Sequence, residues 1–274
     1  MTERHDLLGN TPTTLPILSQ TFAVNGWKFN MTKLTTLFTC GILISLGACA
    51  APLQPIPQWQ SLTLNDFENV NGSDTTWTQR DDVIVCSGIP NGGARLIAPV
   101  TNFELELDWK HHVYGGNAGV FLWCPESAFT DLPPGALPRS GIEVQVLDLG
   151  YEENWFKQHG KQSDWFTSHG DVFPVGASTM TATTPQITYT YADGSSAVVG
   201  NPKSSRSFPT QRLTNGVGEW NHYRILAVDG HVTLWVNGVE VNSGSDCQPA
   251  QGFLALEAEG SLVEYRGLKI RRLP

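Results

Sequence analysis

The chain has 274 residues, of which 27 are glycine and 17 are proline, and only 16% are charged. This composition is typical of one large β-rich domain and argues against a disordered or fibrous protein. The formal net charge of −9, without an extended cluster of Lys and Arg, argues against nucleic-acid binding, which depends on neutralised phosphates, and favours a neutral ligand.

The first feature in chain order is an export signal. Lys33 precedes an apolar run over residues 34–46, which is too short for a transmembrane helix of about 20 residues but has the length of a signal-peptide core. The tetrapeptide Leu-Gly-Ala-Cys that ends at Cys49 resembles a lipobox. We therefore predict a bacterial lipoprotein signal over residues 31–48 with Cys49 lipidated, the alternative being an ordinary cleaved signal with an incidental cysteine.

This signal divides the chain into segments. Residues 1–30 look like an upstream extension, residues 49–58 form a Pro-rich spacer behind the anchor, and residues 59–274 form a single domain. We expect a bacterial envelope protein, periplasmic or at the outer membrane, that contacts the membrane through its lipid. Three further cysteines would allow one of three possible disulfides in an oxidising compartment: Cys86, Cys124 and Cys247.

Strand patterns follow the spacer. Residues 103–109 alternate strictly between apolar residues and carboxylates, as in a half-buried antiparallel strand. Residues 223–241 predict three strands joined by Asp-Gly and Asn-Gly, which favour type I′ turns. Other predicted strands are residues 83–86, 95–99, 120–123, 142–147, 252–258 and 268–272. No segment has a long helical period, so the sequence predicts an all-β sandwich or jelly roll of two sheets.

Two long loops interrupt the strands, over residues 124–140 and 149–216. The second is unusually aromatic, and long loops on a rigid sandwich often carry binding sites. Its aromatic residues either stack on sugars or cover a small second core: Trp155, Phe156, Trp165, Phe166 and Phe173.

The densest polar pattern is Glu-Val-Gln-Val-Leu-Asp over residues 143–148. Glu143 and Gln145 share one strand face, and a β-bulge after Gln145 would turn Asp148 onto that face. The spacing is similar to the bulged ExDxxE strand of laminarinase-type glycoside hydrolases, although Gln and Asp here replace two of its acids. The alternative is a strand whose Glu and Asp face solvent.

Two further candidates lie in glycine-rich segments. Asn117 follows two glycines and offers both a donor and an acceptor. His169-Gly170-Asp171 places a base beside a carboxylate, which suits proton transfer, although a hydrogen-bonded loop histidine is the plainer interpretation. No cysteine or histidine spacing predicts zinc, no cofactor motif is identified, and a need for a divalent metal stays open.

Five motifs, taken in order, resemble the 3-keto-disaccharide hydrolase domain family over residues 59–274: NGGARLIAPVTNFELELDWK, GGNAGVFLW, GIEVQVLD, GEWNHYRILAVDGHVTLWVNGVEV and VEYRGLKIRRL. The resemblance implies a concanavalin-like jelly roll, exported by bacteria, that acts on glycosides whose C3 hydroxyl is oxidised to a ketone. Such a ketone acidifies the C2 proton, so a base can start elimination of the C1 aglycone before water adds back. The chain departs from the family pattern at Ala118 and Trp123, which leaves the sugar and the aglycone open.

For this chemistry we predict Glu143 or His169 as the proton-transfer residue, with Asp148 as a third catalytic candidate. Candidate sugar-binding residues are Asn117, Gln145, Asp171 and Trp165. Two other functions fit the same sequence. One is a non-catalytic, lectin-like carbohydrate-binding protein, and the other is a structural envelope lipoprotein whose aromatic loops contact a protein partner.

Overall fold

The computed structural model describes residues 56–191 and 193–274. The predicted signal, Cys49 and most of the spacer therefore lie outside the described residues. Within the described ranges, no helix combines the length and apolar character that crossing a bilayer requires.

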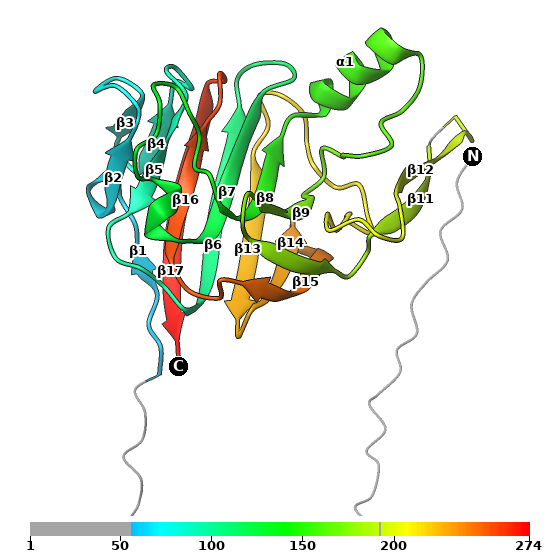
Figure 1. Ribbon diagram of the computed structural model, residues 1–274. Coiled ribbons are helices and arrows are strands. Elements are labelled where there is room, and N and C mark those ends of the chain that lie inside the picture. The colour runs from blue at the N-terminus through cyan, green and yellow to red at the C-terminus, as the bar shows by residue number, and fades with distance from the viewer. Residues whose placement is uncertain (1–55, 192) are drawn as a thin grey trace, which may run out of the picture. The chain divides into compact units, whose positions relative to one another are not determined.

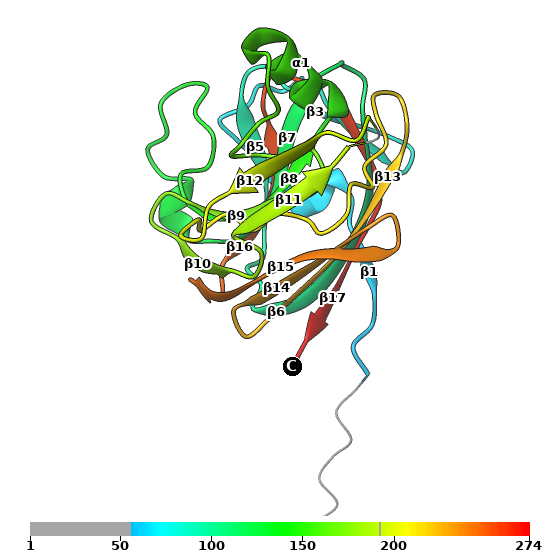
Figure 2. The same cartoon turned by 90° about the vertical axis from the view of Figure 1, so that its right-hand side faces the viewer.

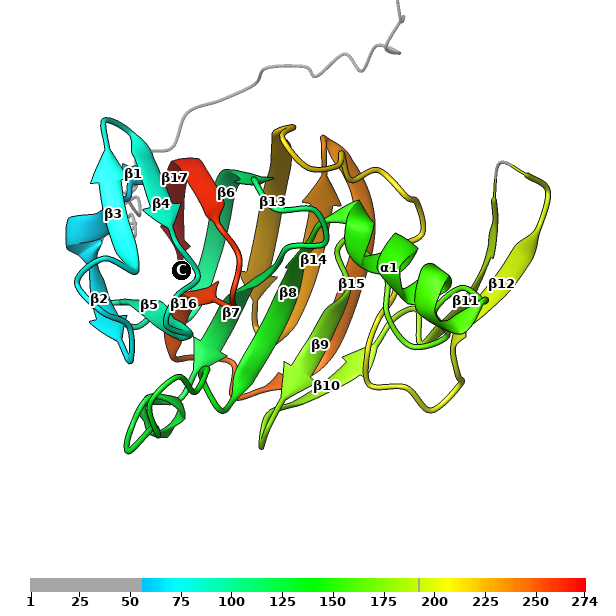
Figure 3. The same cartoon turned by 90° about the horizontal axis from the view of Figure 1, so that it is seen from above.

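Two antiparallel sheets pack face to face (Figures 1 and 3). The larger sheet has the order β10-β15-β14-β13-β6-β17-β4-β3, with β1 paired to β17, and the smaller sheet has the order β2-β5-β16-β7-β8-β9. Both are entirely antiparallel, which confirms the predicted all-β jelly-roll sandwich. The strands of the larger sheet are β1 (Gln60–Ser61), β3 (Trp77–Arg80), β4 (Val83–Cys86), β6 (Asn102–His111), β10 (Thr179–Ala182), β13 (Asn221–Val228), β14 (His231–Val236), β15 (Val239–Gln248) and β17 (Val263–Leu273); those of the smaller sheet are β2 (Phe67–Val70), β5 (Gly92–Leu96), β7 (Asn117–Cys124), β8 (Gly141–Leu147), β9 (Val172–Val175) and β16 (Phe253–Ala258).

The core lies between the sheets and follows the period of two along each strand. In β6, Phe103, Leu105 and Leu107 are at most 1% exposed, as the alternating pattern predicts. The predicted turns are also present, because both residues of Asp229-Gly230 and of Asn237-Gly238 have the positive φ that a type I′ turn requires. These turns join β13, β14 and β15 into the expected meander.

The outer face of the larger sheet carries what we call the ion-pair ladder. The three carboxylates of β6 face away from the core and pair with basic side chains of the neighbouring strands. Glu104 binds Arg224 and Arg271, Glu106 binds Lys269 at 2.7 Å, and Asp108 binds Arg266 at 3.0 Å and His222 at 2.8 Å. Opposite charges on neighbouring antiparallel strands stabilise the sheet, so this face is charge-paired.

The long segment after β8 is more regular than predicted. It contains helix α1 (Leu149–His159), then β9 and β10, and then the hairpin of β11 (Gln186–Thr190) and β12 (Ser196–Gly200). This hairpin lies beyond the β9 end of the sandwich in Figures 1 and 3, and it faces the viewer in Figure 2. Asp148 is the N-cap of α1, and Gly160 ends the helix in the left-handed conformation. Two short 3-10 helices also occur, η1 (Leu64–Asp66) and η2 (Glu126–Ala128).

The cysteines of the domain are buried thiols. Cys86, Cys124 and Cys247 are all free, so none of the three disulfides that the sequence allows is formed between them. Burial raises the pKa of Cys86 and of Cys247 to about 12, which keeps these thiols protonated and unreactive.

Candidate functional site

The polar side chains of β8 line a cavity on the outer face of the smaller sheet, which we call the sheet pocket. Ile142, Val144 and Val146 enter the core, so Glu143 and Gln145 necessarily face outward. The cavity has a volume of about 330 Å³. Its polar lining comprises Asn117, Glu143, Gln145, Arg206, Glu257 and Glu259, and its aromatic lining comprises Phe121, Tyr151, Trp165, Phe166 and Phe173.

Two buried carboxyl groups in this pocket border the same small space. Gly119 of β7 lies between Glu143 on β8 and Glu257 on β16. A methyl group added to Gly119 would lie 2.8 Å from Glu143 Oε1 and 2.9 Å from Glu257 Oε2. Glycine therefore lets both carboxyl groups approach the same point above β7, and Glu257 Oε2 has no hydrogen-bond partner among the described residues.

Their surroundings change the protonation of both acids. Burial raises the pKa of Glu143 to about 8, and the carboxylates of Glu259 and Asp171 add to this while Arg206 opposes it. Burial, together with the charges of Glu143 and Glu259, raises the pKa of Glu257 well above its ordinary value. Near neutral pH the pair therefore holds protons that it can exchange with a ligand, a pattern common at acid–base sites.

An amide relay orients the third acid. Gln145 Nε2 donates to Asn117 Oδ1 at 2.8 Å and to the Ala118 carbonyl at 3.1 Å, and Asn117 Nδ2 in turn donates to Glu259 Oε2. In such a chain the NH₂ group of each amide donates and its oxygen accepts, so the orientation of one amide fixes that of the next. The predicted residues Asn117 and Gln145 thus lie together and fix Glu259 at the edge of the pocket.

Arg206 supplies the positive charge of the sheet pocket. It binds the fully buried Asp171 at 2.9 Å and lies 3.5 Å from the centre of the Phe173 ring. Thr167 also donates to Asp171 through its backbone N–H at 2.9 Å and through its hydroxyl. Asp171 is therefore a support for Arg206 behind the pocket wall rather than part of its lining.

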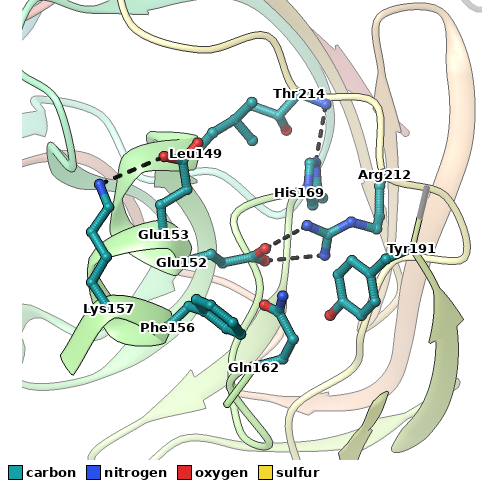
Figure 4. Close-up of a pocket in the computed structure, with 10 residues that line it drawn as sticks. All are labelled: Leu149, Glu152, Glu153, Phe156, Lys157, Gln162, His169, Tyr191, Arg212 and Thr214. Carbon is teal, nitrogen blue, oxygen red and sulfur yellow. Dashed lines mark hydrogen bonds and ion pairs between the residues drawn. The ribbon is translucent and has the colours of Figure 1, made fainter. Parts of the chain in front are cut away.

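A second cavity, the helix pocket, has a volume of about 460 Å³ and shares no lining residue with the first. Figure 4 shows its central ion pair, in which Arg212 binds both carboxylate oxygens of Glu152. His169 lies here, apart from Glu143. Its Nδ1 accepts a hydrogen bond from the Thr214 N–H at 3.2 Å, so the neutral ring carries its proton on Nε2. Burial and the charge of Arg212 hold the pKa of His169 well below 6.5.

The predicted bulge after Gln145 is wrong. Strands β7 and β8 pair without a register shift, from Gly119 opposite Gln145 to Asn117 opposite Leu147. Leu147 therefore faces the sheet pocket, and Asp148 does not. Asp148 Oδ2 instead accepts the backbone N–H of Gly115 at 2.7 Å and that of Gly150 at 2.8 Å. An acid directly after a strand and before a helix serves as its N-cap, and the structure does not bring Asp148 to Glu143.

The aromatic loop contains the small second core that was one of its two predicted roles. Phe166 is 3% exposed and packs edge-on against Tyr151, Trp155 and Trp165. Trp165 is 50% exposed at the mouth of the sheet pocket. A small aromatic core therefore lies under the loop, and the Trp165 ring projects from it beside the sheet pocket.

Sequence reasoning missed Glu257, Glu259 and Arg206. The glutamates were visible in Leu-Ala-Leu-Glu-Ala-Glu, where acids recur at every second position of a predicted strand. Arg206 lies in a loop without any local signal. Among residues 56–191 and 193–274, no group of three His, Cys, Asp or Glu side chains is arranged to hold a metal ion.

Comparison with known proteins shows what the chain is similar to. Two crystal structures of candidate glycosyl hydrolases from Parabacteroides distasonis have TM-scores of 0.49; one is 21% identical and covers 77% of this chain and 89% of its own, and the other is 22% identical and covers 79% and 100%. The carbohydrate-binding module CBM66 from Bacillus subtilis, 11% identical, has a TM-score of 0.45 and covers 75% of this chain and 95% of its own. Comparison with curated proteins finds no match. The family model of the 3-keto-alpha-glucoside-1,2-lyase-like domain matches residues 58–271, so the chain belongs to this carbohydrate-related family, whose motifs its sequence resembles.

Proposed function

We propose that the sheet pocket cleaves glycosides whose C3 carbon is a ketone. The observation that carries the proposal is the pair of Glu143 and Glu257 around the space above Gly119, both with raised pKa values. Two neighbouring buried acids that each hold a proton near neutral pH can divide the roles of base and acid in one reaction once one of them has lost its proton.

The reaction begins at C2 of the keto sugar. Glu143 as carboxylate takes the C2 proton, and the electron pair of the C–H bond moves toward C3 to form an enolate. The enolate then expels the C1 oxygen while Glu257, in its protonated form, gives its proton to that leaving oxygen. Addition of water across the new C1–C2 double bond completes a net hydrolysis, with no covalent bond to the enzyme.

The remaining pocket residues fit roles in binding. The Arg206 guanidinium stands close enough to Glu143 to influence its pKa, so it is placed to stabilise the negative charge of an enolate. The Asn117 and Gln145 amides offer hydrogen bonds to sugar hydroxyls, and the exposed Trp165 ring offers a stacking face. His169 lies in the other pocket, so this proposal gives the proton transfer to Glu143.

The first test measures release of 3-keto-glucose from 3-keto-trehalose and 3-keto-glucosides, beside the unoxidised parent sugars and with and without EDTA. Cleavage of the keto sugars alone, with a primary isotope effect from deuterium at C2, is the expected result. Glu143→Gln should lower kcat by about 10²- to 10⁴-fold, the usual contribution of a general base, whereas the exposed Glu240→Gln should not. Sugar binding without any turnover would instead establish the lectin-like function.

We also propose that the protein is exported and lipid-anchored at Cys49, on the strength of the lipobox-like sequence. Expression in a bacterial host with radiolabelled palmitate should label the wild type and not Cys49→Ser. Equal fractionation of both proteins with membranes, or absence of label from both, would contradict the anchor.

A further inference from the structure

The helix pocket is built from elements that the sheet pocket does not use. Its walls are one face of α1, the loop that holds Arg212 and Thr214, and Tyr191 from the turn that follows β11 (Figure 4). Its volume of about 460 Å³ falls within the range of about 300–1,000 Å³ that small-ligand sites occupy.

The charges that line this pocket cancel. Arg212 pairs with Glu152, and Lys157 lies 3.9 Å from Glu153. The backbone N–H of Ser168 also donates to Glu152 at 2.7 Å, so the ion pair is fixed on both sides. Because no charge is left over, the pocket has no electrostatic preference for an anion or a cation and suits a neutral polar molecule.

Aromatic surface and hydrogen-bonding groups lie side by side in it. Phe156 is 47% exposed, and Figure 4 shows the Gln162 amide between the rings of Phe156 and Tyr191. The Arg212 guanidinium lies 5.0 Å from the centre of the Tyr191 ring and holds it in place. Flat apolar faces beside a planar amide and a planar ion pair match a sugar, whose C–H face is apolar and whose rim is hydroxylated.

The wall also has unused hydrogen-bonding capacity. Thr214 Oγ1 and His169 Nε2 are buried and have no partner among the described residues, and buried polar atoms usually have one. His169 Nε2 carries the proton, as its Nδ1 bond to Thr214 requires. This part of the pocket can therefore donate to a ligand hydroxyl or to a water molecule that bridges to one.

The pocket does not end at a single ring. Beyond Phe156 and Gln162, a neighbouring hollow of about 580 Å³ continues between the segment after α1 and the β11–β12 hairpin. Its lining is mostly polar and includes Lys161, Asp164, Asp193 and Ser195. The two hollows share Phe156 and Gln162, which gives room for several linked sugar units along one groove.

We propose that the helix pocket and this adjoining hollow form a second carbohydrate site, which binds a neutral oligosaccharide and takes no part in the chemistry of the sheet pocket. The site would hold a glycan chain next to the catalytic pocket. Its existence does not depend on the keto-sugar reaction, because binding can be measured with unoxidised sugars.

The test is calorimetric titration of the full-length protein, in a Glu143→Gln background, with cellotetraose, laminaritetraose and maltotetraose. We expect at least one of these neutral glucans to bind. Phe156→Ala and Tyr191→Ala should each weaken that binding by about tenfold, because loss of an aromatic face costs up to about 1.5 kcal/mol. Trp59→Ala, which removes a partly exposed aromatic residue beside Lys269 and Arg271, is the matched control and should bind normally.

Turnover separates the two pockets. With Glu143 intact, Phe156→Ala should cleave a small 3-keto-glucoside at the wild-type rate. The proposal is overturned if none of the three glucans binds, if Phe156→Ala and Tyr191→Ala leave the affinity unchanged, or if Trp165→Ala in the sheet pocket alone abolishes binding. Circular dichroism of each variant, matching the wild type, checks that the fold is retained.

Discussion

Replacement of Glu143 by glutamine should make the protein more stable in alkaline solution, although it removes the proposed base. Glu143 is buried and its pKa is raised from 4.5 to about 8. In the unfolded chain the carboxyl loses its proton near pH 4.5, whereas in the folded protein it keeps it until about pH 8. The stabilising effect of the protonated group is thus complete below pH 4.5 and is lost as pH rises to about 8.

The size of the effect follows from that interval. Each pH unit between the two pKa values corresponds to about 1.4 kcal/mol, so the free energy of unfolding of the wild type should fall by up to about 5 kcal/mol relative to the glutamine variant. The difference between the two proteins should be nearly constant below pH 4.5, grow across the interval and become constant again above pH 8.

Urea unfolding followed by circular dichroism at several pH values from 4 to 9 would measure this. The exposed Glu240→Gln is the matched control and should follow the wild type throughout. If Glu143→Gln also runs parallel to the wild type from pH 4 to pH 9, the carboxyl is not held protonated by burial, and the inference that Glu143 exchanges its proton near neutral pH is refuted.

Three further changes test other parts of the structure. Asp148→Ala should cost about 1 kcal/mol of stability by removing the helix cap, and Asp148→Asn should keep both stability and turnover; loss of turnover in the asparagine variant would show that Asp148 has a catalytic role. Gly119→Ala should abolish most turnover, since its methyl group would lie 2.8 Å and 2.9 Å from the carboxyl oxygens of Glu143 and Glu257 and would displace them; normal kinetics would contradict this. Cys86, Cys124 and Cys247 should react with a thiol reagent only after denaturation, and rapid labelling of the native protein would disprove their burial.

Much of the sandwich was predictable because apolar and polar residues alternate along its strands and so show which side chains face the core. Phe103, Leu105 and Leu107 face the core on every second position, and the Asp-Gly and Asn-Gly turns fix how β13, β14 and β15 pair. Helix α1 escaped prediction because only Gly150 and Glu152 among its residues are buried, so it shows no apolar period. Asp148 marks the start of the helix as its N-cap, but it was predicted to be a catalytic residue instead.

Only part of the candidate site could be predicted from the sequence. The period of two along paired strands predicts a shared face for Asn117, Glu143 and Gln145, and all three line the sheet pocket. Glu257 comes from a strand more than one hundred positions away, and its closeness to Glu143 depends on the order β16-β7-β8 in the sheet, which no local pattern specifies. His169 and Asp171 are neighbours in sequence, yet the left-handed Gly170 between them sends one to each pocket region.

The ion-pair ladder has a practical consequence for handling the protein. It covers the outer face of the larger sheet, on the opposite side of the sandwich from the sheet pocket. Its partly exposed pair of Glu106 and Lys269 contributes only about 0–1 kcal/mol. The three cysteines of the domain are buried, so a single cysteine introduced at Glu106 would give the domain one reactive thiol on that face. Immobilised through it on a sensor chip or resin, the domain would present its sheet pocket to the flowing solution in one uniform orientation.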